Sequence, residues 1–505
     1  MQYILKKKDE ILRNIDYPVV AFLVVIIIGS ITLFCEPVIG MADNGDFYRE
    51  ISTNGVYELN PNDNDLYNGY FYKNYGIYKY NNENEKIYTS TQGIFIKGAI
   101  CINKIFNKNY VLDIRFMSWM FLLAEAIGIY LIVKVLINEI IKEKHKIIIT
   151  LITSLIFCDT AYLSYYNSFY GEAINISFFL LSVGILLYMI EVNKFNIFNI
   201  LMFGISSFIF FGAKQQLAPV GILIAILVLR IGFKRKDKLF KGLSLLLFVG
   251  FVVSSILFYK TITGDFEYIN SYHSMNRGIL LYEDDPDEII KYFNLDQQYS
   301  LLKETTFYDD VTLVNLYDNK LIENYYKKFT TTKILSYYIT HPRAFFKLLK
   351  ISFNNAYSIR PNAMGNYEKS ANKEFGAKSY FFALYSTIKQ KVFTGNSIFS
   401  LITIIIYIYI SLSRYIKGYK SKDNKIILKE EAYFYIFLIG LSQIVISVIG
   451  AGDADLSKHV FMYNMSFDLI LIYLISIKLQ ERTIRHNQKN KFTFNKLRGT
   501  QSGTN

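Results

Sequence analysis

Ten long apolar runs, separated by polar connections, constrain the fold of this 505-residue chain more than any other feature. A helix needs about 20 apolar residues to cross a hydrocarbon core. With 52% hydrophobic and only 19% charged residues, the composition excludes an ordinary soluble two-domain protein. We predict an all-α, polytopic membrane protein with about ten transmembrane helices, namely Tyr17–Cys35, Phe116–Ile137, Ile147–Tyr162, Ala173–Ile190, Phe195–Gly212, Leu217–Phe233, Leu243–Tyr259, Ser397–Ser413, Ala432–Gly450 and Val460–Ile477.

The lysines and arginines predict the orientation of these helices. The formal net charge is +13, and the basic residues lie in short connections such as 142–146, 234–238 and 414–431 rather than on one soluble face. This distribution argues against a nucleic-acid partner. With ten spans every basic connection falls on one side, which the positive-inside rule places in the cytoplasm together with both termini. The excess of Ile, Asn, Lys, Tyr and Phe looks like the codon bias of an AT-rich bacterial genome, so we expect a bacterial plasma membrane.

The polar stretches predict how the chain is organised outside the membrane. Within the first external loop, Gln92–Phe106 has apolar residues at helical spacing interrupted by Lys97 and Lys104, which indicates an interfacial helix. The predicted parts are an N-terminal transmembrane module at 1–260 with external loops at 36–111 and 159–172, an external and mostly helical domain at 261–396, C-terminal transmembrane helices at 397–478, and a basic cytoplasmic tail at 479–505.

Four separate motifs with acidic or basic side chains converge on the predicted outer face. They are Asp43 with Asp46, Asp159 with Glu172, Lys214, and the group Asp453, Asp455, Lys458 and His459. Each has an ordinary structural alternative: Asn44-Gly45 is a common turn signal, Glu172 suits a helix N-terminus, and Lys214 suits a membrane boundary. Their convergence is the signal, because a carboxylate can act as a general base while cations stabilise a departing phosphate.

Other reactive side chains lie within the apolar runs. Asp468 and Glu125 fall inside predicted spans and are either functional or satisfied polar residues of the bundle interior. Three scattered cysteines, Cys35, Cys101 and Cys158, have neither metal-binding nor disulfide spacing. We interpret the cysteines as packing residues.

Several motifs together are similar to a known family. A first external loop with an acid pair, an interfacial helix, a second acid before the fourth span and a large late external domain resemble the GT-C superfamily of polyprenyl-phosphate-sugar-dependent glycosyltransferases. The closer resemblance is to bacterial surface-glycan hexose transferases of the WsfD type. It covers nearly the whole chain and rests on these strings: Ala42-Asp43-Asn44-Gly45-Asp46-Phe47-Tyr48-Arg49, Phe169-Tyr170-Gly171-Glu172, Ala213-Lys214-Gln215, Tyr272-His273, Arg277-Gly278, His341-Pro342, Arg360-Pro361, Gly365-Asn366-Tyr367 and Gly452-Asp453-Ala454-Asp455-Leu456-Ser457-Lys458-His459.

The resemblance implies a hexosyltransferase that moves a hexose from a polyprenyl phosphate, namely undecaprenyl phosphate, to a cell-surface glycan or glycolipid acceptor outside the membrane, with inversion at the anomeric carbon. The acids of the first loop are split as Asp43 and Asp46, which leaves open which of them is the base. A divalent cation, magnesium or manganese, also stays open. The implied catalytic residues are Asp46, Asp43 and Glu172, and the implied substrate-binding residues are Lys214, Arg49, Lys458, His459, Asp453, Asp455 and Arg277.

Two alternatives share the pattern of many spans and one large external loop. One is a glycan polymerase or ligase of another fold, and the other is a flippase or transporter of lipid-linked sugars. A flippase needs charges along a path through the membrane, whereas most of these charges lie at its outer edge. This contrast favours the enzyme.

Overall fold

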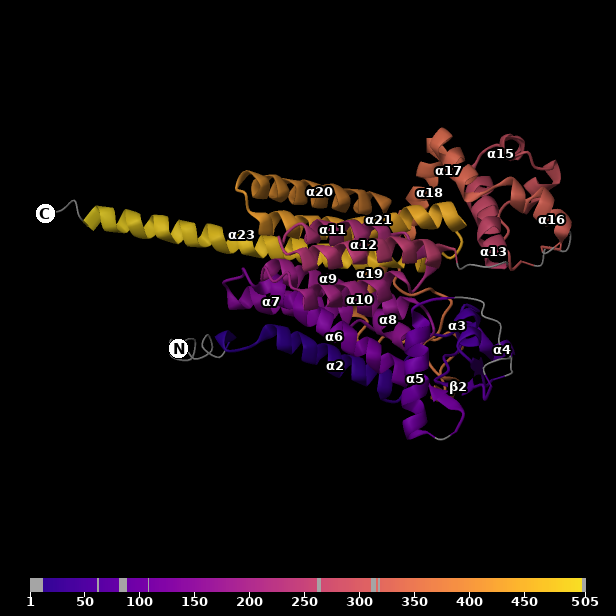
Figure 1. Cartoon of the computed structure of the whole chain (residues 1–505), viewed down its shortest axis with the longest axis horizontal. Helices are drawn as coiled ribbons and strands as arrows, with labels where there is room; N and C mark the ends of the chain where they lie inside the picture. Colours follow the sequence, from indigo (N-terminus) through magenta and orange to yellow (C-terminus); the bar gives the residue numbers. More distant parts are fainter. Residues whose placement is uncertain are drawn as a thin grey trace.

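A bundle of long helices forms most of the molecule, with shorter elements gathered at one end (Figure 1). The computed structural model describes residues 12–60, 63–80, 89–107, 109–260, 265–309, 315–316 and 318–501. Within them the only strands form one small sheet, and the helices include a set long and apolar enough to cross a membrane. The prediction of an all-α polytopic membrane protein is confirmed.

Each of the ten predicted spans corresponds to a helix. Eight helical segments of the described chain, counting α11 with the short turn η3 before it, have the length and apolar composition of membrane spans. A ninth is a bent pair, and α10 is a shorter apolar helix. The bundle helices are α2 (Tyr17–Phe34), α6 (Arg115–Ile137), α7 (Glu143–Phe157), α9 (Glu172–Glu191), α10 (Ile197–Phe211), η3 (Gln215–Leu217), α11 (Val220–Gly232), α12 (Lys238–Tyr259), α20 (Ser397–Lys420), α21 (Asn424–Ala451) and α23 (Phe461–Gln501).

The third span departs from the prediction. Instead of one continuous helix over 147–162, α7 ends at Phe157, and the chain bends by 41° into α8 (Thr160–Leu163) and η2 (Ser164–Tyr166). Asp159 has an extended backbone, and its side chain accepts a hydrogen bond from Ala161 N (2.9 Å). Because this side chain caps a new helix, the first helix cannot continue through it.

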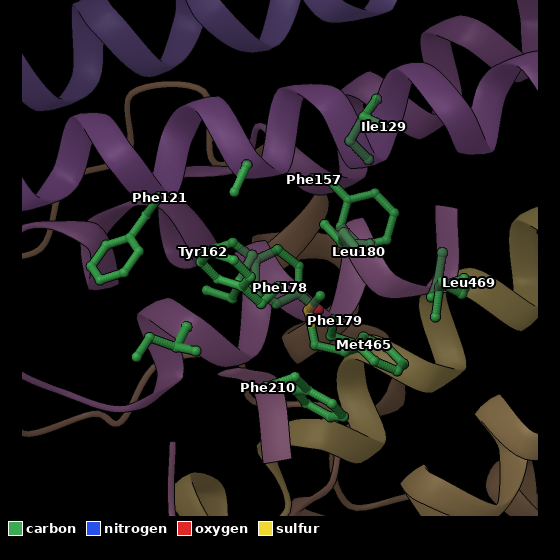
Figure 2. Close-up of a cluster of buried hydrophobic side chains, with 14 of the residues drawn as sticks. Phe121, Ile129, Phe157, Tyr162, Phe178, Phe179, Leu180, Phe210, Met465 and Leu469 are labelled. Carbon is green, nitrogen blue, oxygen red and sulfur yellow. The ribbon is translucent and has the colours of Figure 1, made fainter. Parts of the chain in front are cut away.

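Glycines allow α6 and α9 to pack closely at the centre of the bundle. A Cβ added to Gly128 would lie 2.6 Å from the backbone carbon of Leu180, and one added to Gly184 would lie 2.8 Å from the Gly128 oxygen. Small residues bring membrane helices into contact in this way. Figure 2 shows the surrounding core, in which side chains of α6, α7, α9, α10 and α23 meet.

The predicted first external loop folds into short elements beside the bundle. Its predicted interfacial helix is present as α5 with the predicted bounds, and Ile94, Ile105 and Phe106 are exposed on it. An antiparallel sheet of order β1-β2-β3 was not predicted, since strands of three or four residues leave almost no periodic signal. The elements are α3 (Phe47–Thr53), β1 (Val56–Glu58), α4 (Asp63–Leu66), β2 (Asn74–Ile77), α5 (Gln92–Phe106) and β3 (Val111–Asp113).

The predicted external domain at 261–396 contains two differently packed parts. Residues between Tyr272 and Ala344 form a hydrophobic cluster of their own. The following stretch instead pairs with the first loop, since Ala42 N donates to Gly365 O (3.0 Å) and Phe71 N to Tyr367 O (3.0 Å). The elements are α13 (Asp265–His273), the π-helix η4 (Ser274–Ile279), α14 (Leu280–Tyr282), α15 (Pro286–Phe293), η5 (Gln297–Leu302), α16 (Asn319–Asn324), η6 (Tyr326–Lys328), α17 (Thr331–Thr340), α18 (Pro342–Asn355), η7 (Lys369–Ala371) and α19 (Leu384–Phe393).

All three cysteines are free thiols. Cys158 is buried, as expected of a packing residue, whereas Cys35 and Cys101 are exposed. The packing interpretation therefore holds for Cys158 alone.

Replacing Gly128 by alanine tests the close approach of α6 and α9. The added methyl group meets the backbone of α9, so we expect a loss of stability of about 1–3 kcal/mol, as for other overpacked cores. Thermal unfolding of the purified protein in detergent measures it. Gly250→Ala is the matched control, because nothing lies within 4 Å of a Cβ at that position on α12. Equal stability of the two variants would contradict the packing.

Candidate active site

The turn that follows α2 is held by the side chain of Asp43. Its Oδ1 accepts hydrogen bonds from the backbone N–H groups of Gly45 (2.8 Å) and Phe47 (3.1 Å). Gly45 has a φ of +100°, which a residue with a Cβ adopts only with strain. The Asn-Gly signal thus marks a real turn, and the turn places Asp46 directly before α3.

Asp46 lies between two cations. Its Oδ1 is 2.7 Å from the Arg49 guanidinium one turn along α3, and its Oδ2 contacts the ammonium group of Lys458. Lys458 comes from α22 (Leu456–His459), 412 residues away in the chain. The Lys458 side chain is 4% exposed and that of Asp46 28% exposed, so the carboxylate is the part of this pair that solvent or substrate can reach.

Asn44 and Tyr170 complete the surroundings of Lys458. Asn44 Oδ1 accepts hydrogen bonds from Lys458 Nζ (3.2 Å) and Tyr170 OH (3.0 Å), and the ammonium group lies 4.6 Å from the centre of the Tyr170 ring. Burial lowers the pKa of Lys458 to about 7, while the charge of Asp43 acts in the opposite direction. Direct contact with the Asp46 carboxylate also favours the charged form, so we describe the two as an ion pair.

A second ion pair joins α9 to the turn after α10. Lys214 Nζ is 2.6 Å from Oε1 of Glu172, which is fully buried. The second oxygen of Glu172 has no hydrogen-bond partner among the described residues. The charges of Lys214 and Glu172 both act on the Asp455 carboxyl, which places Asp455 beside this pair. Lys214 thus reaches a buried carboxylate instead of extending along a membrane boundary.

His459 directly follows Lys458 and contacts Gln216. Its Nδ1 is 3.2 Å from Oε1 of Gln216, and Gln216 Nε2 donates to the His459 carbonyl (2.8 Å). Burial first, and then the positive charges of Lys214 and Lys458 and of more distant basic groups, lower the pKa of His459 to about 3. An imidazole in this position accepts or donates a hydrogen bond at neutral pH without adding a charge.

Asp43 has a carboxyl neighbour that the sequence did not indicate. Its Oδ2 is buried and has no hydrogen-bond donor in the described part of the chain. Burial raises the pKa of Asp43, and burial together with the charge of Asp43 raises the pKa of Glu58 on β1 to about 7. Two adjacent carboxyl groups repel each other when both are ionised, which favours the protonated form of each. Asp43 therefore serves both the turn and this pair.

Asp453 and Arg277 bind each other. Arg277 Nε is 2.7 Å from Asp453 Oδ1, its second terminal nitrogen is 3.1 Å from Oδ2, and Tyr282 OH donates to the same Oδ2 (2.5 Å). The backbones meet at Gly452, where a Cβ would lie 2.4 Å from Gly278 N. This contact fastens the π-helix η4 to the end of α21. A role of the two residues in substrate binding stays a prediction.

The ten predicted site residues thus form neighbouring groups at one end of the bundle. Asn44, Glu58, Tyr170 and Gln216 were not predicted to be site residues. Asn44 and Tyr170 lie inside the motifs on which the resemblance rests, so their position was a signal. Glu58 had no such signal in the sequence, because only the fold of β1 brings it to Asp43. The groups are Asp43, Asp46, Arg49 and Lys458; Glu172, Lys214 and Asp455; His459, which follows Lys458; and Asp453 with Arg277.

Asp46, Glu172 and Asp453 are each paired with cations rather than grouped around a common point. No group of three or more His, Cys, Asp or Glu side chains within the described ranges has an arrangement that holds a metal ion. Asp46 and Glu172 each place at least one oxygen against a lysine. These residues do not form a ligand set for magnesium or manganese.

The two acids inside predicted spans have polar partners. Asp468 accepts hydrogen bonds from Tyr162 OH (2.6 Å) and from Lys389 Nζ (2.6 Å), which comes from α19. Glu125 accepts one from Tyr166 OH (2.9 Å). Asp468 fits the interpretation as a satisfied polar residue of the bundle interior. Glu125 fits it only in part, because its Oε1 is buried without a hydrogen-bond partner among the described residues.

Comparisons with known proteins point to one family. The family described as YfdI N-terminal transmembrane domain matches residues 5–496. The Escherichia coli (strain K12) protein titled "Uncharacterized protein YfdI" is 41% identical over 69 residues, which is 14% of this chain and 15% of that protein. No solved structure matches the chain.

Replacing Glu58 by glutamine tests the carboxyl pair through the pH dependence of stability. The pKa of Glu58 is about 7 in the folded protein and about 4.5 in a solvated chain, so the folded state binds more protons between these values. Stability of the wild type is then expected to fall as pH rises from about 4.5 to 7. The Glu58→Gln variant should lose the part of this slope that Glu58 contributes, while Glu50 on α3, whose pKa burial also raises to about 7, keeps its own part.

Thermal unfolding between pH 4.5 and 8 in one detergent measures the effect. Glu288→Gln, at an exposed position of α15, is the control and should keep the slope of the wild type. A variant at Glu58 with the unchanged slope would show that the pKa of Glu58 is not raised in the folded protein.

Proposed function

Since the chain belongs to the family of the YfdI N-terminal transmembrane domain, we propose that it is a GT-C-type glycosyltransferase of the bacterial plasma membrane. It transfers a hexose from a polyprenyl-phosphate donor to a glycan or glycolipid acceptor at the outer face, with inversion at the anomeric carbon. The resemblance to WsfD-type hexose transferases supplies the donor class. The side-chain chemistry supplies the support described below.

The observation that carries the proposal is the contact of Asp46 with Lys458 and Arg49 beside the Glu172–Lys214 pair. An accessible carboxylate and several cations meet at one place although they come from distant parts of the chain. Transfer from a phosphate ester needs both, because the acceptor hydroxyl loses a proton while negative charge grows on the leaving phosphate.

In the proposed reaction the acceptor oxygen bonds to the anomeric carbon as the bond from that carbon to the phosphate oxygen breaks. The hydroxyl proton passes to the Asp46 carboxylate, and the bonding electron pair leaves with the polyprenyl phosphate. Attack on the face opposite the phosphate inverts the anomeric centre. Lys214, Lys458 and Arg49 stabilise the departing phosphate, and Asp43 with Glu58 shapes the turn that carries Asp46.

Donor binding has a direct consequence for the base. Without donor, Asp46 holds Lys458 and Arg49, and a carboxylate in two ion pairs is a poor proton acceptor. A phosphate that enters between them competes for both cations and frees Asp46 at the moment when the acceptor needs a base. Asp46 rather than Asp43 fits this role, because Asp43 is buried and its Oδ1 is occupied by two backbone N–H groups.

The alternative of a flippase finds less support. Its charges would have to line a path through the bilayer, whereas Asp468 and Glu125 are bound to side chains that fill the bundle interior. A glycan polymerase or ligase shares the same cluster of charges. A polymerase or ligase would use a different donor from the proposed hexosyltransferase. A transfer assay with defined polyprenyl-phosphate hexoses therefore distinguishes these two functions.

Replacing Asp46 by asparagine tests the base. The amide keeps the shape of the side chain but cannot accept the proton, so hexose transfer should fall by about 10²- to 10⁴-fold. Transfer from radiolabelled polyprenyl-phosphate hexoses in membranes measures this loss.

Asp65→Asn is the matched control, because Asp65 is an acid of the same loop paired with a distant lysine, Lys369, outside the cluster. It should stay close to wild-type activity. Full transfer in the Asp46 variant together with a dead Asp43→Asn variant would reverse the assignment of the base, and no transfer by the wild type from any polyprenyl-phosphate hexose would overturn the function.

The proposed orientation is tested with single cysteines in intact cells. Cys35 and Cys101 are exposed and Cys158 is buried, so all three are first replaced by serine. A cysteine at Asn64 should then react with an impermeant thiol reagent, and one at Asp423 should react only after the cells are opened, because the basic connections lie inside. Labelling at Asp423 alone in intact cells would contradict the external site.

A further inference from the structure

A cavity of about 900 Å³ lies at the opposite end of the bundle from the cluster around Asp46. It opens where α9, α10, α11 and α21 end or begin, on the side that carries the predicted cytoplasmic connections. Four basic residues line it, and no acidic residue does: Lys194, Lys234, Arg235 and Lys425.

The charges of this lining are only partly compensated. Lys425 is paired with Glu191 (2.7 Å) and Glu139 (3.3 Å) outside the lining. Lys234 instead donates to an amide oxygen, that of Asn424 (3.3 Å). The nearest carboxylate that acts on Lys234, Glu431, is already held by Arg230 at 3.1 Å.

The surroundings of Lys234 disfavour its own positive charge. Burial and the positive charge of Arg230 lower the pKa of Lys234, with Glu431 acting in the opposite direction. Arg235 donates to the Phe195 carbonyl (2.9 Å) and lies 3.3 Å from Asp237, so its position is fixed at the edge of the cavity. Lys194 is exposed beside it.

Apolar residues form the remaining wall. Ile190, Phe195 and Leu428 line the cavity together with the basic side chains. A soluble inorganic anion gains nothing from contact with an apolar wall, whereas a membrane lipid carries both a phosphate and acyl chains that pack against apolar residues. Basic pockets between membrane helices on the cytoplasmic side bind anionic headgroups in this way.

Basic residues alone are expected at this end from the positive-inside rule. The concave arrangement of several cations, without an acid in the lining and with an apolar wall, goes beyond that expectation. From this arrangement we propose that the cavity is a binding site for a phosphate anion, carried by an anionic glycerophospholipid of the cytoplasmic leaflet. The site is separate from the proposed transfer site and does not depend on the proposed function.

The test uses the full chain purified in detergent. Thermal stability is measured against added phosphatidylglycerol, phosphatidylcholine and inorganic phosphate, and bound lipid is counted by native mass spectrometry. We expect stabilisation and retained lipid with phosphatidylglycerol only. The double variant Lys194→Gln/Lys234→Gln should bind it more weakly by roughly fivefold for each lysine removed, the effect of one basic residue near an anionic lipid surface.

Two further variants make the result specific. The control variant is Lys417→Gln/Lys420→Gln. It removes two exposed lysines from the last turn of α20, which lies at the same end of the bundle as the cavity but does not line it, and it should bind phosphatidylglycerol like the wild type. Lys194→Arg/Lys234→Arg keeps the charge and should retain binding, which separates loss of the site from misfolding. Equal weakening in the α20 pair and the cavity pair would overturn the site, and stabilisation by inorganic phosphate equal to that by phosphatidylglycerol would overturn the lipid as its ligand.

Discussion

The contact between Lys458 and Asp46 is the interaction on which the candidate active site depends. Removing an ammonium group from water costs several kcal/mol unless partners replace its hydration. Asp46, Asn44 and the Tyr170 ring provide these partners from the first loop and from the segment before α9. Taking away one partner of a fully buried pair typically costs about 3–5 kcal/mol, and the cost is smaller here because the Asp46 side chain is 28% exposed. The turn at Gly45 and the short helix α22 therefore form one unit, although the chain between them contains most of the protein.

Two other ion pairs attach the remaining external parts to the bundle. Arg277 fixes η4 to the loop after α21 through Asp453, and Lys389 fixes α19 to α23 through Asp468. The close packing at Gly128 supplies a rigid support beneath them. The candidate active site is consequently built on helix ends whose positions are fixed, which is what preorganised chemistry requires.

The spans, the helix α5 and the convergence of separate charged motifs were predictable from the sequence, because apolar runs, helical spacing and Lys/Arg asymmetry are local signals. The partners were not predictable. In the sequence Lys389 looks like an ordinary basic residue of a short helix, and only the packing of α19 shows its contact with Asp468. Glu58 belongs to no motif, and only the fold of β1 brings it to Asp43. The bend at Asp159 depends on a side chain that caps a new helix instead of facing a membrane surface. In each case tertiary contact decides the role of a residue whose local sequence is neutral.

The account stands on the claim that a phosphate takes the cations of Asp46. The most direct measurement is an experimental structure of the full chain in lipid nanodiscs with undecaprenyl phosphate. The account predicts the phosphate within hydrogen-bond distance of Lys458 and near Lys214, with the contact between Lys458 and Asp46 opened. A phosphate bound elsewhere, with that contact intact, would contradict it.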